Sequence, residues 1–417
     1  MTELDDSLGT EIAARRADLI TLTQDLIRIQ TLNPPGRNYR EICDFLEARL
    51  SPRFTCELVR AHGAPGDAER TPRWNIVARR RQGAGDCVHF NSHTDVGEVG
   101  HGWTKDPFGG EGADGRIYGR GACDMKGGLA ASIIAAEAFI DTCPEFQGAI
   151  EISGTADEET GGYGGVAYLA EQGAFEHVDH VIIPEPLNKD RICLGHRGVW
   201  WAEIETQGRI AHGSMPFLGD SAIRHMGAVL EEMETWLYPL LASKHTEMPV
   251  VPEGAKQSTL NVNSIHGGEP EMEPGFTGFP APCVADRCRI VSDRRFLIEE
   301  DLDEVKAEIR GMLERIRETR PGFAYEVREL HEVIPTMTER DAPVVRSVSA
   351  AIKKVLARQP DYVVSPGTYD QKHIDRIGRL KNCIAYGPGI LDLAHQPDDS
   401  AKVMALTLAE RLVPEAG

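Results

Sequence analysis

The first half of the chain alternates segments of helical periodicity with short apolar runs that end in polar residues. Apolar residues recur at helical spacing from about 10 to 30 and again over 40–50, and "NPPG" at 33–36 ends the first of these segments. Strands are predicted over 74–81, 86–93, 148–159 and 177–186, and a helix rich in small residues over 125–140. This alternation predicts an α/β domain with a largely parallel sheet.

The pattern of predicted helices and strands changes near residue 195. Strands are predicted over 199–209, 258–268, 284–297 and 323–330, and helices over 219–241 and 299–320. The resulting order β-α-β-β-α-β is that of a ferredoxin-like two-layer unit. We therefore expect residues 195–332 to form a domain inserted into the first one, whose two parts are 1–194 and 333–417.

Polar residues gather where the strands of the first domain end. They are His93 and Asp95, then Asp124, then Asp157, Glu158 and Glu159, and then Glu185. In open α/β sheets the ligand crevice forms outside the carboxyl ends of the strands, so these side chains are expected near one another. Any one of them alone is more typical of a helix cap or a solvated loop.

Five of the polar residues form a candidate metal-ligand set: His93, Asp124, Glu159, Glu185 and His395. Imidazoles and carboxylates suit Zn²⁺, Co²⁺ or Mn²⁺ better than the metals that prefer thiolates. Five ligands exceed what one catalytic zinc with an open position needs. They fit two divalent ions about 3.5–4 Å apart that share a carboxylate and a bridging water.

Two neighbours of these ligands have candidate roles in catalysis. Asp95 is two residues beyond His93 and can accept a hydrogen bond from the imidazole nitrogen that does not bind metal. Glu158 is adjacent to Glu159 and would point to a different side of the chain, which suggests a general base acting on the bridging water.

Composition restricts the partners. A chain of 417 residues exceeds the size of one hydrophobic core, which supports two domains. With 45 Lys and Arg against 65 Asp and Glu, the formal net charge is -20, so nucleic acid and membrane surfaces are poor partners and a small-molecule substrate is expected. Nine scattered cysteines without a C-x-x-C pair, and an acidic N-terminal segment, indicate a cytoplasmic protein with reduced thiols.

The longer motifs resemble those of a known enzyme family. They are "SHTDVG" (92–97), "DPFGG" (106–110), "DGRIYGRGACDMKGGLAA" (114–131), "GTADEETGGYGG" (154–165), "PEP" (184–186), "YGPG" (386–389) and "AHQPDD" (394–399). The chain resembles the co-catalytic metallohydrolases that include acetylornithine deacetylase, succinyl-diaminopimelate desuccinylase, aminoacylase and carboxypeptidase G. The resemblance implies a zinc-peptidase-like α/β catalytic domain with an inserted dimerisation or lid domain.

The resemblance also assigns roles to individual residues. It implies that His93 and Glu185 bind one metal, that Glu159 and His395 bind the other, and that Asp124 bridges them. It matches Asp95 to the orienting carboxylate and Glu158 to the general base. Zinc is the first expectation, with cobalt and manganese as alternatives.

The inserted domain and a later loop carry further matched residues. "GRIAHGSMPFLGDSAI" (208–223) resembles the family segment in which a histidine, here His212, reaches the active site of the partner subunit and stabilises the oxyanion. A homodimer follows from this resemblance. Arg295 matches a family arginine that binds a substrate carboxylate, and Gly367 and Thr368 match a loop that contacts substrate.

Several positions depart from the desuccinylase-like pattern. His196 in "GHRG" (195–198) replaces an arginine, "APCVAD" (281–286) lacks an asparagine, "GTYDQKH" (367–373) follows the Gly-Thr with unusual residues, and "GEVG" follows "HTDV". These departures weaken a desuccinylase assignment in particular.

The sequence therefore predicts a metal-dependent hydrolase of an amide C–N bond in a small N-acyl amino acid, of the deacetylase or deacylase type. A dipeptidase or carboxypeptidase, a hydrolase of an unusual C–N bond such as that of an aromatic amine, and a non-catalytic metal- or protein-binding homologue remain alternatives.

Overall fold

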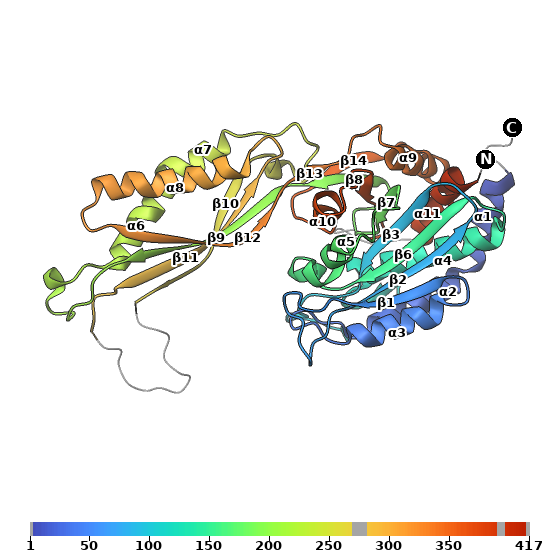
Figure 1. Ribbon diagram of the computed structural model, residues 1–417, viewed down its shortest axis with the longest axis horizontal. Helices are drawn as coiled ribbons and strands as arrows, with labels where there is room; N and C mark the ends of the chain where they lie inside the picture. The colour runs from blue at the N-terminus through green and yellow to red at the C-terminus, as the bar shows by residue number, and fades with distance from the viewer. Residues whose placement is uncertain (1–2, 269–281, 390–396, 414–417) are drawn as a thin grey trace. The chain divides into compact units, whose positions relative to one another are not determined.

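The chain is described here by a computed structural model that covers residues 3–268, 282–389 and 397–413. It divides into two compact units (Figure 1). The first consists of Met1–Gly195, Met337–Val363 and Tyr369–Gly417, and the second of His196–Thr336 and Val364–Thr368.

A nine-stranded sheet forms the centre of the first unit, in the order β1-β2-β6-β3-β7-β15-β8-β13, with β14 paired to β8. Its strands are β1 (Thr55–Arg60), β2 (Trp74–Gln82), β3 (Cys87–His93), β6 (Gly148–Thr155), β7 (His180–Ile183), β8 (Arg191–His196), β13 (Thr336–Met337), β14 (Asp361–Ser365) and β15 (Cys383–Ala385). β6, β3, β7 and β15 pair in parallel, whereas β1, β2 and β8 pair antiparallel. The predicted α/β class is confirmed, and the parallel part of the sheet is its middle.

The middle strands are buried on both faces. Every residue of β3, β6 and β7 is buried. Strands are buried in this way when helices pack on both faces of a sheet. Solvent-accessible polar residues then occur only where the strands end. The helices of this unit are α1 (Glu3–Ala14), α2 (Arg16–Arg28), α3 (Tyr39–Leu50), α4 (Gly127–Thr142), α5 (Tyr168–Glu171), α9 (Pro343–Leu356), α10 (Gln371–Arg376) and α11 (Pro397–Leu412).

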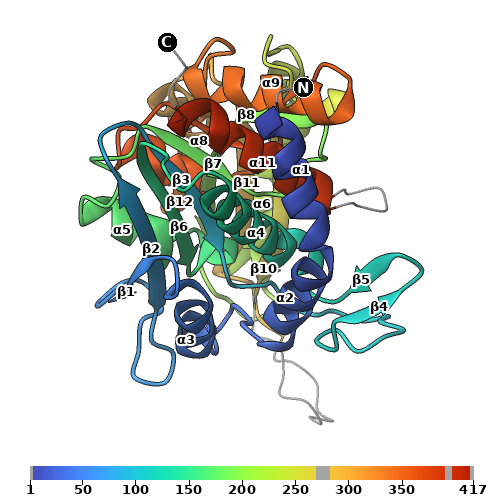
Figure 2. The same cartoon turned by 90° about the vertical axis from the view of Figure 1, so that its right-hand side faces the viewer.

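Helix α4 lies beside helices α1 and α2 (Figure 2). Its residues from Gly127 to Ile140 are all buried, and it contacts β3, β6, α1, α2 and α11. Small residues permit this close packing. A side chain at Gly128 would place a Cβ atom 2.1 Å from the carbonyl oxygen of Pro184, so glycine is required where the start of α4 meets the loop after β7.

Two predicted elements differ in detail. The single helix predicted over 10–30 is two helices, α1 and α2, because the backbone at Arg15 leaves helical geometry with φ -88° and ψ 5°. The Arg15 guanidinium there donates to the carboxylates of Glu11 and Asp141. The short hairpin of β4 (Glu111–Ala113) and β5 (Arg116–Tyr118) was not predicted, because three-residue strands carry almost no periodicity.

The second unit has a four-stranded antiparallel sheet in the order β10-β11-β9-β12. Its elements in chain order are β9 (Gly198–Gln207), α6 (Ala222–Glu232), α7 (Tyr238–Ala242), β10 (Thr259–Gly267), β11 (Arg287–Phe296), α8 (Leu302–Thr319) and β12 (Ala324–Val333). The order β-α-β-β-α-β and this strand arrangement are those of a ferredoxin-like unit.

The core of the second unit lies between this sheet and helices α6 and α8. Alternate residues of β9 are buried, among them Trp200 and Ile204, and they pack with Val229 and Leu313 from the helices. The side chain of Asp301 accepts hydrogen bonds from the first backbone N–H groups of α8, so this carboxylate caps the helix.

Among the residues that the structure describes, no helix combines the length and the apolar composition that crossing a bilayer requires.

Candidate metal and catalytic site

The candidate site lies where the parallel strands of the first unit end. His93 is the last residue of β3 and pairs in register with Thr155, the last residue of β6. β7 lies on the other side of β3 and leads directly to Glu185. Because these strands are parallel neighbours, the loops after them share one edge of the sheet, as the sequence predicted.

Three of the five predicted ligands gather into one cluster. The Nε2 atom of His93 lies 3.0 Å from Asp124 Oδ1 and 3.8 Å from Glu185 Oε1. One donor atom from each of the three residues lies within 4.8 Å of the others, so they could hold one metal ion. Asp124 reaches the cluster from the irregular turn before α4, where its φ and ψ of -117° and 98° are not helical.

The charges of this cluster fit a divalent cation. Burial favours a lower pKa for His93, but its hydrogen bonds to Asp124 and Asp95 raise it well above the ordinary value. Burial and the charge of Asp124 raise the pKa of Glu185 well above its ordinary range. Carboxylates concentrated around one imidazole contribute to both shifts, and a bound cation would offset this excess of negative charge. The donor types, imidazole nitrogen and carboxylate oxygen, are those that zinc, cobalt and manganese accept.

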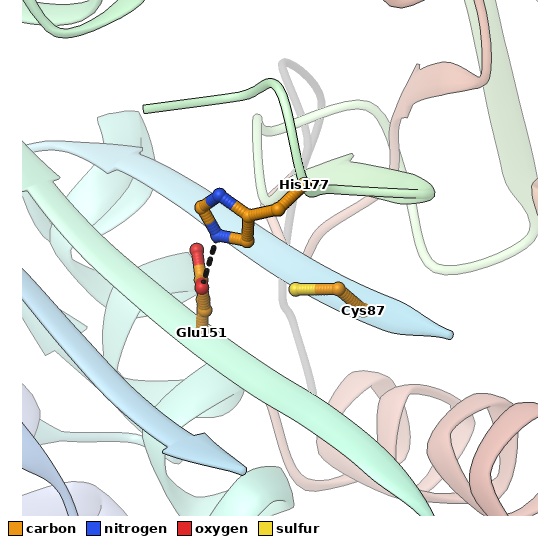
Figure 3. Close-up of side chains that lie close together, drawn as sticks. All are labelled: Cys87, Glu151 and His177. Atoms are coloured by element: carbon orange, nitrogen blue, oxygen red, sulfur yellow. Dashed lines mark hydrogen bonds and ion pairs between the residues drawn. The ribbon is translucent and has the colours of Figure 1, made fainter. Parts of the chain in front are cut away.

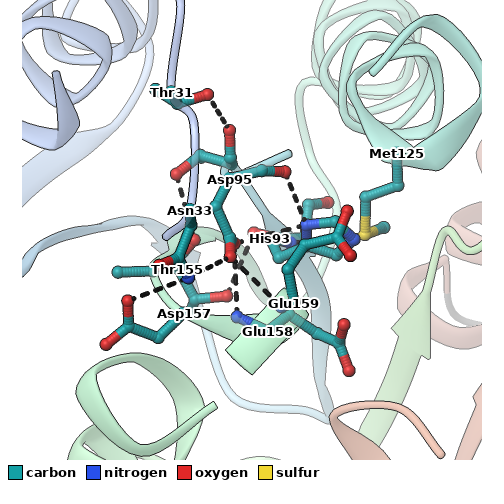
Figure 4. Close-up of polar contacts among 12 residues, drawn as sticks. Thr31, Asn33, His93, Asp95, Met125, Thr155, Asp157, Glu158 and Glu159 are labelled. Atoms are coloured by element: carbon teal, nitrogen blue, oxygen red, sulfur yellow. Dashed lines mark hydrogen bonds and ion pairs between the residues drawn. The ribbon is translucent and has the colours of Figure 1, made fainter. Parts of the chain in front are cut away.

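Asp95 is buried and joins the cluster to the next loop (Figure 4). One of its carboxylate oxygens lies 3.4 Å from His93 Nδ1, and the Asp95 backbone oxygen lies 3.0 Å from the same nitrogen. The carboxylate also accepts hydrogen bonds from the backbone N–H groups of Glu158 and Glu159, at 3.2 and 3.1 Å. Asp95 therefore holds both the imidazole and the turn that carries the two glutamates, and the sequence predicted only the first contact.

Glu158 and Glu159 occupy a short turn after β6, and their carboxylates point in different directions (Figure 4). Glu159 accepts a hydrogen bond from the backbone N–H of Gly97 at 2.9 Å, and burial raises its pKa to about 7. Glu158 accepts a hydrogen bond from Lys372 Nζ at 3.1 Å. Glu159 is outside the group of three described above, so its predicted role as a ligand stays a prediction.

A buried network that the sequence did not reveal supports this turn. Asn33 donates to Asp95 Oδ2 at 2.9 Å and to Asp157 Oδ1 at 3.2 Å, and Tyr39 donates to the same Asp157 oxygen at 3.0 Å. The Arg73 guanidinium donates to Asp157 Oδ2 at 2.9 Å. These partners lie 62 to 124 residues apart in sequence, and each alone has the appearance of an ordinary loop residue.

The other predicted site residues lie elsewhere. His395 falls outside the described residues. His212, Arg295, Gly367 and Thr368 belong to the second unit. The His212 imidazole is exposed, with Nδ1 2.8 Å from Ser214 Oγ. Arg295 makes a bidentate ion pair with Asp293 at 2.7 and 2.9 Å. The Gly367 N–H donates to Ser365 Oγ at 3.2 Å.

A second cluster lies toward the start of β3, where Cys87, Glu151 and His177 approach one another (Figure 3). Glu151 Oε1 is 2.6 Å from His177 Nε2 and also accepts from Arg79, while Oε2 is 3.1 Å from His89 Nδ1. Burial raises the pKa of the Cys87 thiol, which keeps it protonated near neutral pH. Because both Glu151 oxygens are engaged and the thiol is neutral, this cluster is an ion-pair network.

An α/β sheet that gathers an imidazole and several carboxylates at its strand ends has the architecture of a metal-dependent enzyme. A sequence profile of "Peptidase family M20/M25/M40" matches residues 89–413. The chain belongs to this family, and it is therefore a hydrolase.

Individual relatives agree with the family assignment. The succinyl-diaminopimelate desuccinylase of Rhodospirillum centenum is 31% identical over 365 residues, which cover 86% of each chain. Human carnosine dipeptidase 1 has the same fold, with a TM-score of 0.74 and 18% identity over 98% of this chain and 99% of that one. A Bacillus subtilis protein described as a dinuclear metal binding peptidase of this family has a TM-score of 0.64 and 16% identity, over 95% of this chain and 97% of that one.

Proposed function

We propose that this chain is a metal-dependent amidohydrolase that cleaves the amide C–N bond of a small N-acyl amino acid. The observation that carries the proposal is the cluster of His93, Asp124 and Glu185 beside the turn of Glu158. A relative 31% identical to this chain is named as a desuccinylase, which removes an acyl group from an amino acid nitrogen.

We propose two divalent ions per chain, with zinc first and cobalt or manganese as alternatives. His93 and Glu185 would hold one ion, Glu159 and His395 the other, and Asp124 both. Bound at these residues, the ions would polarise the acyl carbonyl and acidify water.

Glu158 is the proposed general base. Its carboxylate would accept a proton from the attacking water and donate it to the departing nitrogen. Asp95 supports both parts of the site, because it contacts the His93 imidazole and accepts the backbone N–H of Glu158.

Two observations bear on the substrate. The Arg197 guanidinium is buried and donates to the backbone oxygens of Ala255, Gln257 and Pro366, so it is engaged within the second unit. Arg295 is paired with Asp293. Neither Arg197 nor Arg295 is therefore held ready for a second carboxylate. We propose a substrate with an uncharged acyl group and one amino acid carboxylate, which would reach Arg295 only by displacing Asp293.

His212 is a proposed oxyanion donor, supplied by a second copy of the chain. Its imidazole is exposed on the second unit, as a group that acts on another subunit must be. We accordingly propose a homodimer, with Gly367 and Thr368 in contact with substrate, and a cytoplasmic location. Sedimentation analysis of the purified protein should give the mass of two chains, and His212→Ala should lower kcat while the dimer persists.

A substrate panel tests the proposed function. Purified protein loaded with Zn²⁺, Co²⁺ or Mn²⁺ is assayed against N-acetyl, N-formyl and N-succinyl amino acids, dipeptides and aryl amides. We expect N-acetyl or N-formyl amino acids to give the highest kcat/KM. Preference for dipeptides or aryl amides would replace this proposal with a peptidase or an aminohydrolase, and inactivity on the whole panel would refute it.

A substitution tests the mechanism on the best substrate of the panel. Glu158→Gln should lower kcat by about 10²–10⁴-fold, the range for loss of a general base, without loss of bound metal. Glu145→Gln is the matched control, because Glu145 is exposed in the same unit and away from the site. A Glu158→Gln protein with full turnover and full metal content would contradict the assignment.

A further inference from the structure

Lys372 is a buried cation whose role no predicted site residue explains. Its side chain is 3% exposed, and it lies in the short helix α10 of the first unit. Its Nζ atom donates to Glu158 Oε1 at 3.1 Å. Burial disfavours a charged lysine, yet the carboxylates of Glu158 and Asp370 outweigh it and raise the pKa of Lys372 above its ordinary value. Lys372 is therefore an ammonium ion within the protein interior.

Asp370 supplies the charge behind this ammonium. It is buried just before α10, and its Oδ2 atom accepts a hydrogen bond from Asn91 Nδ2 at 2.8 Å. Asn91 in turn accepts from the Ser153 hydroxyl at 2.9 Å, and both residues lie on the buried middle strands β3 and β6. The position of Asp370 is thus fixed by the rigid part of the sheet.

Helix α10 also holds the backbone of the turn after Glu158. His373 Nε2 lies 2.7 Å from the carbonyl oxygen of Gly161. The same helix therefore contacts the side chain of Glu158 through Lys372 and the end of its turn through His373. A glutamate with several rotatable bonds gains one defined carboxylate position only when such contacts restrict it.

We propose that Lys372, backed by Asp370, is the positioning residue that fixes the Glu158 carboxylate for proton transfer. The ammonium holds Oε1, which leaves Oε2 to face the reacting groups. This proposal rests on the proposed function of Glu158 as the general base. It requires a cation at Lys372 and not only a side chain of similar volume.

The first test removes the charge and keeps the shape. In the metal-loaded full chain, Lys372→Met should lower kcat by about 10²-fold, the effect expected for a catalytic group displaced by about 1 Å. The KM and the bound metal should change by less than about threefold, because the substitution touches no proposed metal ligand or substrate contact. Lys381→Met is the matched control, since Lys381 is exposed and pairs with Asp375 at the end of α10.

Restoring the charge separates positioning from a structural role. Lys372→Ala should regain turnover when ethylammonium is added, with saturation, whereas tetramethylammonium, which cannot donate a hydrogen bond, should have no effect. Lys372→Arg should keep kcat within about tenfold of the parent, and it is the decisive variant if Lys372→Met does not fold. A folded, metal-loaded Lys372→Met with kcat within threefold of the parent would overturn the proposal. An Arg variant as impaired as the Met variant, without rescue of the Ala variant, would overturn it as well.

A structural readout keeps this test independent of the proposed activity. In crystals of the parent protein, the Glu158 carboxylate should lie within hydrogen-bond distance of Nζ, and in Lys372→Met it should occupy other rotamers. An unmoved carboxylate in the variant refutes the positioning role. If the parent hydrolyses no amide of the panel, the proposed function fails, and the position of Glu158 in the two crystal structures still decides the role of Lys372.

Discussion

Replacing Glu151 by glutamine removes the central anion of a buried network on the first unit. Glu151 lies on the middle strand β6 and is fully buried. Burial opposes its ionisation, but the hydrogen bonds and charges of His89 and His177 outweigh burial and lower its pKa from an ordinary value of 4.5 to about 2. Arg79 donates to the same carboxylate. The folded protein therefore binds the Glu151 proton much more weakly than the unfolded chain.

This difference fixes the size and the sign of the effect. Because the pKa of Glu151 is lower in the folded protein than in the unfolded chain, its ionised form stabilises the folded state at pH values above 4.5. This stabilisation is lost as the pH falls from 4.5 toward 2. A tenfold difference in proton affinity corresponds to about 1.4 kcal/mol. Glu151 therefore contributes roughly 3 kcal/mol to the free energy of unfolding at pH 7 and roughly 2 kcal/mol at pH 3.5. Glu151→Gln removes this contribution.

Urea unfolding of the metal-free protein measures the contribution of Glu151 to stability. At pH 7.5 the unfolding free energy of Glu151→Gln should be lower than that of the parent by roughly 3 kcal/mol, and the difference should shrink by about a third at pH 3.5. Glu57→Gln, on the exposed side of the edge strand β1, is the control and should stay within about 0.5 kcal/mol of the parent. A Glu151→Gln difference below 1 kcal/mol at pH 7.5, or one that does not fall with pH, would refute this account of the network.

Four further perturbations have definite expected outcomes. Asp95→Asn should weaken metal affinity by about 10–100-fold in calorimetric titration, because Asp95 contacts the His93 imidazole and is proposed to orient it; unchanged affinity would exclude that role. Arg73→Met leaves the buried Asp157 carboxylate without its guanidinium and should lower the unfolding free energy by about 3–5 kcal/mol in urea titration. Ile134→Ala, in the buried helix α4, should cost about 2–5 kcal/mol in the same assay. Chelation with EDTA should lower the melting temperature of the parent protein and change that of Asp95→Asn less, since only the folded site binds metal.

The strands that the sequence predicted well are those whose burial leaves a strong pattern. β3 and β6 are buried along their whole length and end in polar residues, so both their apolar runs and their ends can be recognised in the sequence. β13 and β15 have two and three residues and pair with partners far away in the chain. Their place is decided by the assembled sheet and not by local periodicity, so a single sequence could not reveal them.

The same distinction applies to the candidate site. His93 and Glu185 could be expected near each other because the parallel strands before them end at one edge. The contacts of Lys372 and Arg73 could not be expected, because their partners are 214 and 84 residues away and lysines and arginines are common on any surface. What identifies these two residues is burial, which only the folded chain determines.

The carboxylates of the first unit differ in how their charge is balanced, and this difference supports the proposed metal site. Asp157 has the Arg73 guanidinium, and Glu158 has the Lys372 ammonium. At His93, in contrast, the carboxylates of Asp124 and Glu185 lie near one imidazole. Hydrogen bonds that outweigh burial raise the pKa of His93, and burial together with the charge of Asp124 raises the pKa of Glu185. Because buried charge without compensation is costly, a place where the described side chains leave negative charge in excess is where a divalent cation gains most. The ion pairs of Asp157 with Arg73 and of Glu158 with Lys372 also keep these two carboxylates from binding metal. Glu158 must stay free of metal if it is to accept a proton as the proposed general base.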